Sequence, residues 1–107
     1  MDLNDLERMI SELNVSVRAL RSTGQEYAKA YTEYRELLSK ELLLVREQGI
    51  PASMCSDVAR GKPHIAKAKF NEICKEAIYK ANLESINALK LQIKILNEQI
   101  GREWSDE

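Results

Sequence analysis

The sequence has few of the residues that build loops, cross-links or catalytic centres. Its 107 residues include four glycines, two prolines, two cysteines and one histidine. So little glycine and proline argues against a fold rich in loops or β-hairpins. Cys55 and Cys74 are too few and too far apart for a disulfide framework, and no CxxC pair indicates zinc or redox chemistry. An all-α protein in a reducing compartment is the expected class.

Neither sign of charge dominates. The 16 basic and 17 acidic residues give a net charge of -1, which predicts no general attraction to nucleic acid or to an anionic membrane. The opening stretch MDLNDLERMI has no uninterrupted apolar run, so we expect neither a signal peptide nor a membrane span. The expected location is the cytoplasm, with no membrane partner.

The first half of the chain has the heptad pattern of a helix that packs along one seam. Gly24 lies on that pattern, but the phase is kept across it, which favours one helix over 3–48 rather than a break at this glycine. The predicted seam comprises Leu3, Leu6, Ile10, Leu13, Val17, Leu20, Tyr27, Tyr31, Tyr34, Leu38 and Val45. Its three tyrosines are interpreted as a core or interface row, with a ligand-stacking surface as the alternative.

Gly49 and Pro51 mark the end of the first helix, and Pro63 suits the first turn of a second one over 63–104. The connector 49–62 is predicted to contain a short helix that Gly61 ends. Two long helices of similar length with a short connector predict an antiparallel hairpin, a single domain over 1–107.

The second long helix carries apolar residues on two nearly opposite faces. One face, the Phe70 stripe, contains Ala66, Phe70, Ile73, Ala77, Ala81, Ala88, Leu91 and Ile95. The other, the Ile86 stripe, contains Leu83, Ile86, Leu89, Ile93, Leu96 and Ile100, between Tyr79 and Trp104. Because one neighbouring helix covers one face only, leaving the other in water would forgo about 10 kcal/mol. We therefore predict a homodimer or higher oligomer, a four-helix bundle with the Ile86 stripe at the interface.

No group of residues predicts catalysis. His64 has no acidic residue near it in the sequence and no nucleophile or metal ligand at a suitable spacing. Cys74 is predicted to be buried and Cys55 to be more accessible. We expect no enzyme, no metal and no cofactor.

The one local excess of charge lies around the start of the second long helix. Arg60, Lys62, Lys67 and Lys69 have no acidic residue between them. A turn that leads into a helix N-terminus can hold an anion, and the outline resembles a helix-turn-helix. A phosphate or nucleic-acid contact is one interpretation of this patch, and a solvated surface is the other.

Residues 41–104 resemble small uncharacterised helical proteins of phages and prophages of Gram-positive bacteria. The resemblance is carried by the turn Gly49-Ile50-Pro51, by the connector sequence DVARG, and by the run from Tyr79 to the terminal Arg102-Glu103-Trp104. It implies a phage context and the bacterial host cytoplasm, and it brings no catalytic residues. The size also resembles the secreted WXG family, but no Trp-x-Gly lies at the bend, which argues against secretion.

The function we expect is that of a non-enzymatic, oligomeric interaction protein. It would act as a scaffold, an adaptor or an inhibitor of a host or phage protein. The alternative is a nucleic-acid-binding accessory protein of phage replication or recombination that uses the basic patch at residues 60–69.

Overall fold

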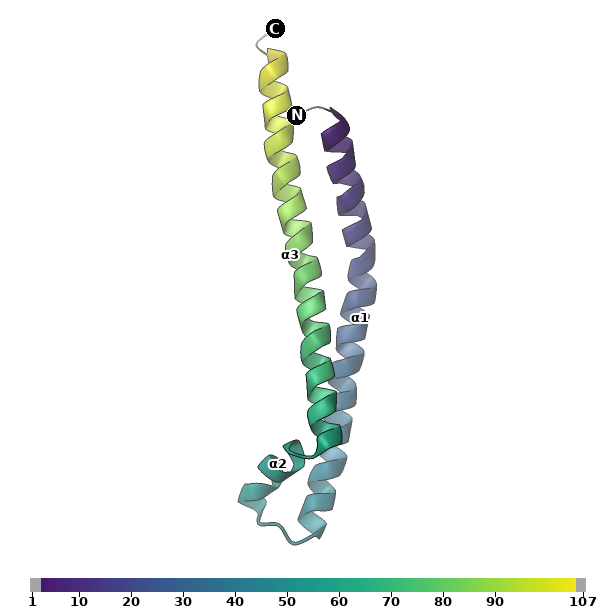
Figure 1. The fold of residues 1–107 in the computed structure, drawn as a ribbon, viewed down its shortest axis with the longest axis vertical. Helices are drawn as coiled ribbons and strands as arrows, with labels where there is room; N and C mark the ends of the chain where they lie inside the picture. The colour runs from purple at the N-terminus through teal and green to yellow at the C-terminus, as the bar shows by residue number, and fades with distance from the viewer. Residues whose placement is uncertain (1–2, 106–107) are drawn as a thin grey trace. The chain divides into compact units, whose positions relative to one another are not determined.

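The computed structural model describes residues 3–105 and consists of three helices in this range, with no strand. They are α1 (Leu3–Glu47), α2 (Ala52–Arg60) and α3 (Pro63–Ser105), drawn in Figure 1. The all-α class is confirmed, and the two long helices begin and end within one residue of the predicted positions. Helix α1 continues through Gly24 without a break, as predicted from the heptad phase that is kept across this glycine.

The helix ends have local causes. Gly49 has a φ of 84°, a left-handed conformation that glycine adopts without steric strain, and its N–H donates to the Arg46 carbonyl at 3.1 Å. Pro51 precedes α2, and its carbonyl accepts from the Met54 N–H at 2.9 Å. Gly61 does end α2, but in a right-handed conformation with φ -76°. The carbonyl of Lys62 then accepts the first hydrogen bonds of α3.

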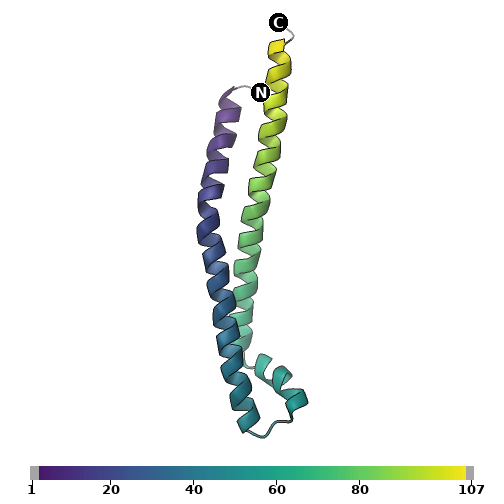
Figure 2. The same ribbon diagram turned by 180° about the vertical axis from the view of Figure 1, so that it is seen from behind.

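Residue contacts divide the chain into two compact units. Unit 1 joins the part of α1 up to Thr23 to the part of α3 from Tyr79 onward, and unit 2 is Gly24–Ile78, including α2. Within each unit the two long-helix segments lie side by side and run antiparallel, as Figures 1 and 2 show.

In unit 1 the apolar Ile86 stripe of α3 faces α1 of the same chain. Ile86 and Leu96 are buried, and the other four residues of the Ile86 stripe are half-buried, in a single copy of the chain. The only segment of unit 1 that can cover them is the first half of α1. The side chains predicted to form an oligomer interface, Leu83, Ile86, Leu89, Ile93, Leu96 and Ile100, are thus buried or half-buried within the single chain, and the Phe70 stripe is the face that α3 leaves exposed.

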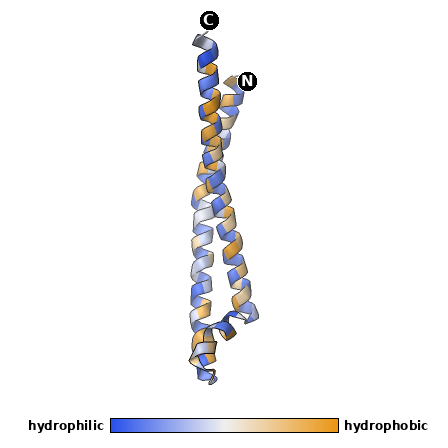
Figure 3. Cartoon of the chain, turned by 90° about the vertical axis from the view of Figure 1, so that its left-hand side faces the viewer, coloured by the Kyte–Doolittle hydropathy of each residue, from blue (hydrophilic) through white to orange (hydrophobic). Residues whose placement is uncertain are grey.

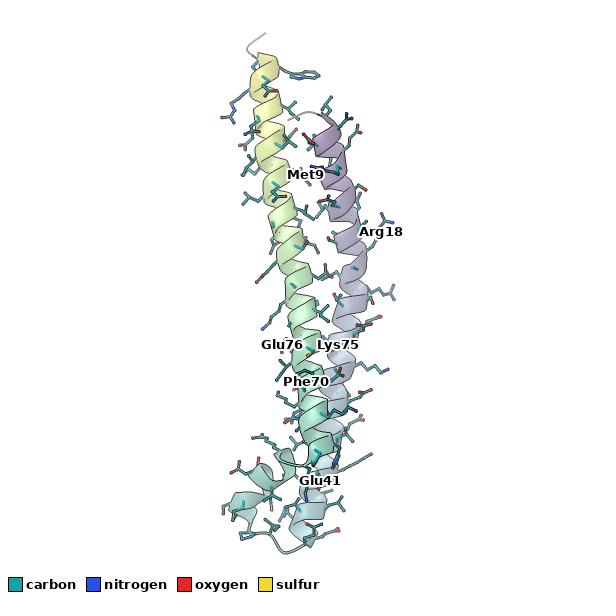
Figure 4. The ribbon with its side chains drawn as sticks, in the orientation of Figure 1. Met9, Arg18, Glu41, Phe70, Lys75 and Glu76 are labelled. Atoms are coloured by element: carbon teal, nitrogen blue, oxygen red, sulfur yellow. The ribbon has the colours of Figure 1, made fainter. Side chains whose placement is uncertain are left out.

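The seam of α1 is also shifted from the predicted one. Ile10, Val17 and Tyr31 are exposed, although they fit an apolar heptad. The inward positions one residue earlier in each heptad are taken by Met9, Ser16, Thr23 and Ala30. Figure 4 labels Met9 on the side of α1 that faces α3. The two possible phases share every seventh residue, so apolar content alone selected the wrong position at 10, 17 and 31, whereas Leu38 and Val45 are buried as predicted.

A polar layer explains part of this shift. Asn82 of α3 donates to the Ser16 carbonyl at 2.9 Å, and its side-chain oxygen accepts from the Thr23 hydroxyl at 2.8 Å. A half-buried amide whose partners are fixed in this way holds two helices in one register. The contact uses the Thr23 hydroxyl and the backbone of Ser16 opposite Asn82.

The core of unit 2 lies where α2 meets both long helices. Its buried residues are Tyr34, Leu38, Val45, Cys55, Ala59 and Ile65, with Leu42, Ile50, Val58 and Ala68 packed against them. Cys55 is thus buried, and Cys74 is only half-buried, the reverse of what the sequence predicted. The Cys55 thiol lies 3.4 Å from the carbonyls of Ile50 and Pro51, which explains its inward position.

Hydrophobic and hydrophilic residues alternate along all three helices, as Figure 3 shows. None of the described helices contains an apolar run that is long enough to cross a membrane.

Candidate interaction surfaces

The first turns of α3 carry their polar and apolar residues on the opposite faces from those expected of a packed helix. Phe70 is 69 % exposed and Ile73 is 54 % exposed, whereas Glu72 between them is only 4 % exposed. Lys75 and Glu76 are half-buried, and Figure 4 labels both close to Phe70. Over residues 70–76, α3 therefore turns charged side chains toward its own chain and apolar ones toward solvent, whereas Ile65 and Ala68 belong to the core.

The inward charges all have partners. Lys69 Nζ donates to Glu72 Oε2 at 2.9 Å, the Tyr27 hydroxyl donates to Glu76 at 2.9 Å, and Lys75 Nζ donates to Glu26 at 3.3 Å. Among the residues that the structure describes, no buried side-chain nitrogen or oxygen lacks a hydrogen-bond partner. A buried carboxylate without such a partner would be strongly destabilising.

Lys69 connects this seam to the solvent side of the unit. Its ammonium group lies 2.9 Å from Glu72 and 4.8 Å from the centre of the Tyr34 ring, at a distance that allows a cation–π contact. The hydrogen bond to Glu72 is the main cause that raises the pKa of Lys69 above its ordinary value. Lys69 therefore stays cationic and neutralises the buried carboxylate.

Unit 2 has an open groove that all three helices line. Its volume is about 630 Å³, and its walls are Tyr31, Tyr34 and Arg35 of α1, Arg60 of α2, and Ile65, Ala66, Lys69, Phe70, Glu72 and Ile73 of α3. Tyr31, Phe70 and Ile73 supply exposed apolar surface. We call this feature the unit 2 groove.

The unit 2 groove has an excess of positive charge. Arg35 and Arg60 form no ion pair with any described residue, and the Glu72 carboxylate in the wall is already paired with Lys69. The predicted basic patch is thus divided: Arg60 and Lys69 line the groove, while Lys62 is half-buried and Lys67 is exposed outside it. Sequence reasoning missed Arg35, because it lies on the other long helix and only the fold brings it near Arg60.

His64 has a partner that its local sequence did not show. Its Nε2 lies 3.3 Å from Glu41 Oε2, and the Glu41 side chain is almost fully buried. The pair joins the start of α3 to α1, a structural role. Within residues 3–105, no three His, Cys, Asp or Glu side chains are grouped so that they could bind a metal ion.

Unit 1 has an apolar surface of its own. Val15 is 61 % exposed and Leu91 is 58 % exposed, with Ile95 close to them in exposure. A shallow hollow of about 530 Å³ lies beside Val15, and its lining consists of Ser11, Glu12, Val15, Ser16, Ser85, Ala88, Leu89 and Gln92, without Leu91 or Ile95. We call the exposed set Val15, Ala88, Leu91 and Ile95 the unit 1 face.

Comparison with known proteins gives no match. No family model, no curated protein and no solved structure matches this chain. The resemblance to phage and prophage proteins therefore stays a prediction, and the function has to be argued from the two surfaces.

Proposed function

We propose that this chain is a non-enzymatic interaction protein that self-associates through the unit 1 face and acts as an oligomeric scaffold or adaptor. The observation that carries the proposal is the exposure of Val15 on α1 and of Leu91 and Ile95 on α3, together with a shallow hollow that Val15 and Ala88 line. Each buried side chain of this kind contributes about 1.5–3 kcal/mol, so covering the three is strongly favourable.

The total accessible surface supports association. The chain exposes 7953 Å² at 12.2 kDa. A compact monomer of that mass exposes about 6,100 Å². The excess of about 1,900 Å² is more than twice the roughly 800 Å² that each partner contributes to a stable interface. Packing against another molecule would cover part of it.

A second copy is the occupant that best fits the unit 1 face. Glu12 is the only charged residue in the lining of the hollow, so a two-fold contact there brings only this one carboxylate toward its equivalent. Serine and alanine residues there allow helices to approach closely. Most soluble oligomers are homo-oligomers with a two-fold axis, in which the same patch meets itself. Two helix pairs joined in this way would form the four-helix bundle that the sequence predicted.

Analytical ultracentrifugation of the Leu91→Glu variant tests the proposal. We expect the wild-type protein to sediment as a dimer or larger species at micromolar concentration and the variant to sediment as a monomer with unchanged helical content. Asn97→Glu is the matched control, because it adds the same charge at an exposed position of α3 about 120° away around the helix. A wild-type monomer, or equal effects of the two substitutions, would reject self-association through this face.

The nucleic-acid alternative has less support. Of the four basic residues, Lys69 is exposed but paired with Glu72, Lys62 is half-buried, and Arg60 and Lys67 are exposed without an ion pair to any described residue. Phosphate binding depends on the number of free cations, and two give a weak, salt-sensitive contact. A low-salt gel shift with single- and double-stranded DNA separates the two functions: a shift that is lost in the Arg60→Ala/Lys67→Ala variant would favour the alternative.

The proposed phage context rests only on the resemblance of residues 41–104 to phage and prophage proteins. On that basis the proposed partner of the scaffold is a host or phage protein in the bacterial cytoplasm.

A further inference from the structure

We infer that the unit 2 groove binds an acidic amphipathic helix of a partner protein. The inference rests on the proposed interaction function and adds the chemistry of the partner. It does not depend on self-association, because the groove and the unit 1 face share no residue.

The walls of the groove suit a partner that inserts apolar side chains. Tyr31 and Phe70 are exposed aromatic residues on different helices, and Ile73 lies one turn beyond Phe70 on α3. Aromatic residues and arginine dominate the binding energy of protein interfaces. A helix that projects residues i, i+3, i+4 and i+7 into such a groove is a recurrent mode of recognition.

The charges of the groove select an acidic partner. Arg35 and Arg60 line it without an ion pair to any described residue. Each guanidinium group can therefore donate two hydrogen bonds to one carboxylate of the partner. A volume of about 630 Å³ is within the usual range for a binding pocket. An acidic helix with an apolar stripe satisfies the arginines and covers the aromatic residues at once.

Two other occupants fit less well. A second copy that docked by the same groove across a two-fold axis would bring Arg35 and Arg60 against their own equivalents, which is repulsive. Nucleic acid could stack bases on Tyr31 and Phe70, but its phosphates would lie near the Glu72 carboxylate in the wall, and the two arginines are too few for more than a weak contact. The observations therefore favour a protein segment.

The test uses the full-length protein and a fluorescent peptide of about 18 residues, five helical turns, with leucines on one face and glutamates on the flanks. Its control peptide has the same leucines and has glutamine in place of every glutamate. We expect saturable binding of the acidic peptide, measured by fluorescence anisotropy, and binding of the neutral peptide that is weaker by about tenfold. Equal binding of the two peptides would overturn the charge argument, and no binding of either would overturn the inference.

Variants locate the site. Arg35→Glu/Arg60→Glu should weaken binding of the acidic peptide by about tenfold or more, and Phe70→Ala should do the same by removing the aromatic anchor. Arg46→Glu is the matched control, because Arg46 is exposed on α1 about three turns from Arg35 and outside the groove. An equal loss in this control, or a single-stranded oligonucleotide that displaces the peptide from the wild-type protein, would contradict the assignment.

Failure of this inference and failure of self-association are distinguishable. The groove variants should sediment like the wild-type protein, and Leu91→Glu should bind the peptide with unchanged affinity per chain. Loss of peptide binding with an intact oligomer would reject only the groove assignment. A monomeric wild-type protein that binds the acidic peptide would reject only the oligomer.

Discussion

Substitutions at the Lys69–Glu72 ion pair test how the inward charged residues of α3 in unit 2 are stabilised. The Glu72 side chain is 6 % exposed and that of Lys69 is 48 % exposed, with 2.9 Å between Nζ and Oε2. A carboxylate at such a position has lost most of its hydration and needs compensation. The two partners are therefore not equivalent: removing the lysine leaves a buried charge unpaired, whereas removing the glutamate leaves a cation that water can reach.

We expect Lys69→Met to lower the free energy of unfolding by about 1–2 kcal/mol. Removing one partner of a fully buried pair costs about 3–5 kcal/mol. Lys69 is half-exposed, however, so water can reach Glu72 after the substitution, and the smaller penalty for an unsatisfied buried group, about 1–3 kcal/mol, applies. The lost cation–π contact with Tyr34 adds about 0.5 kcal/mol at an exposed site.

Glu72→Leu should change the free energy of unfolding by less than about 1 kcal/mol or increase it, because leucine gains burial where the carboxylate lost hydration. The double variant Lys69→Met/Glu72→Leu should recover the stability lost in Lys69→Met. Urea unfolding followed by circular dichroism, at one protein concentration for all variants, gives the coupling energy. Equal losses in the two single variants, or a coupling energy below about 0.5 kcal/mol, would refute the assigned roles.

Three further predictions concern other contacts. His64→Ala should lower the free energy of unfolding by about 1 kcal/mol, because the buried Glu41 loses its partner, and a His64→Gln variant that recovers none of the loss would contradict this reason. Asn82→Leu should change the free energy of unfolding by less than about 1 kcal/mol but give more than one set of NMR signals for the contact between α1 and α3, and a single unchanged set would show that this amide does not fix the register. A thiol reagent should modify Cys74 faster than Cys55 in the native protein, and a faster Cys55 would contradict the packing of α2.

The helices themselves follow from the sequence. Gly49, Pro51 and Pro63 mark ends that the chain must have, and a heptad pattern that keeps its phase across Gly24 required one long helix. These features are local, so composition and spacing suffice to predict them.

The faces of the helices were harder to predict, because the polar residues of the seam depend on partners from distant segments. Glu72 is buried because Lys69 and the first helix enclose it, and Asn82 faces inward because Ser16 and Thr23 lie opposite. A rule that places apolar residues inside cannot find such positions. This rule predicted that the Ile86 stripe packs against a second chain. It did not predict the pair of His64 with Glu41, because the two residues lie on different helices.

The groove was out of reach for the same reason. Arg35, Arg60 and Phe70 come from three helices, and no spacing in the sequence connects them. Half of the basic patch, Arg60 and Lys69, does lie in the groove, but Lys69 is engaged with Glu72. A charge count along the chain does not distinguish a free cation from a paired one.

The exchange of polar and apolar faces in α3 links the stability of unit 2 to binding. Placing Phe70 and Ile73 in the seam instead of on the surface would have contributed about 1.5–3 kcal/mol each. Together they represent a large part of the 5–15 kcal/mol that holds a typical domain. The chain alone forgoes this stabilisation, and the inferred partner of the unit 2 groove would restore it by covering the two side chains. The exposure of Phe70 and Ile73 is therefore the physical basis of the inference that this groove binds a partner.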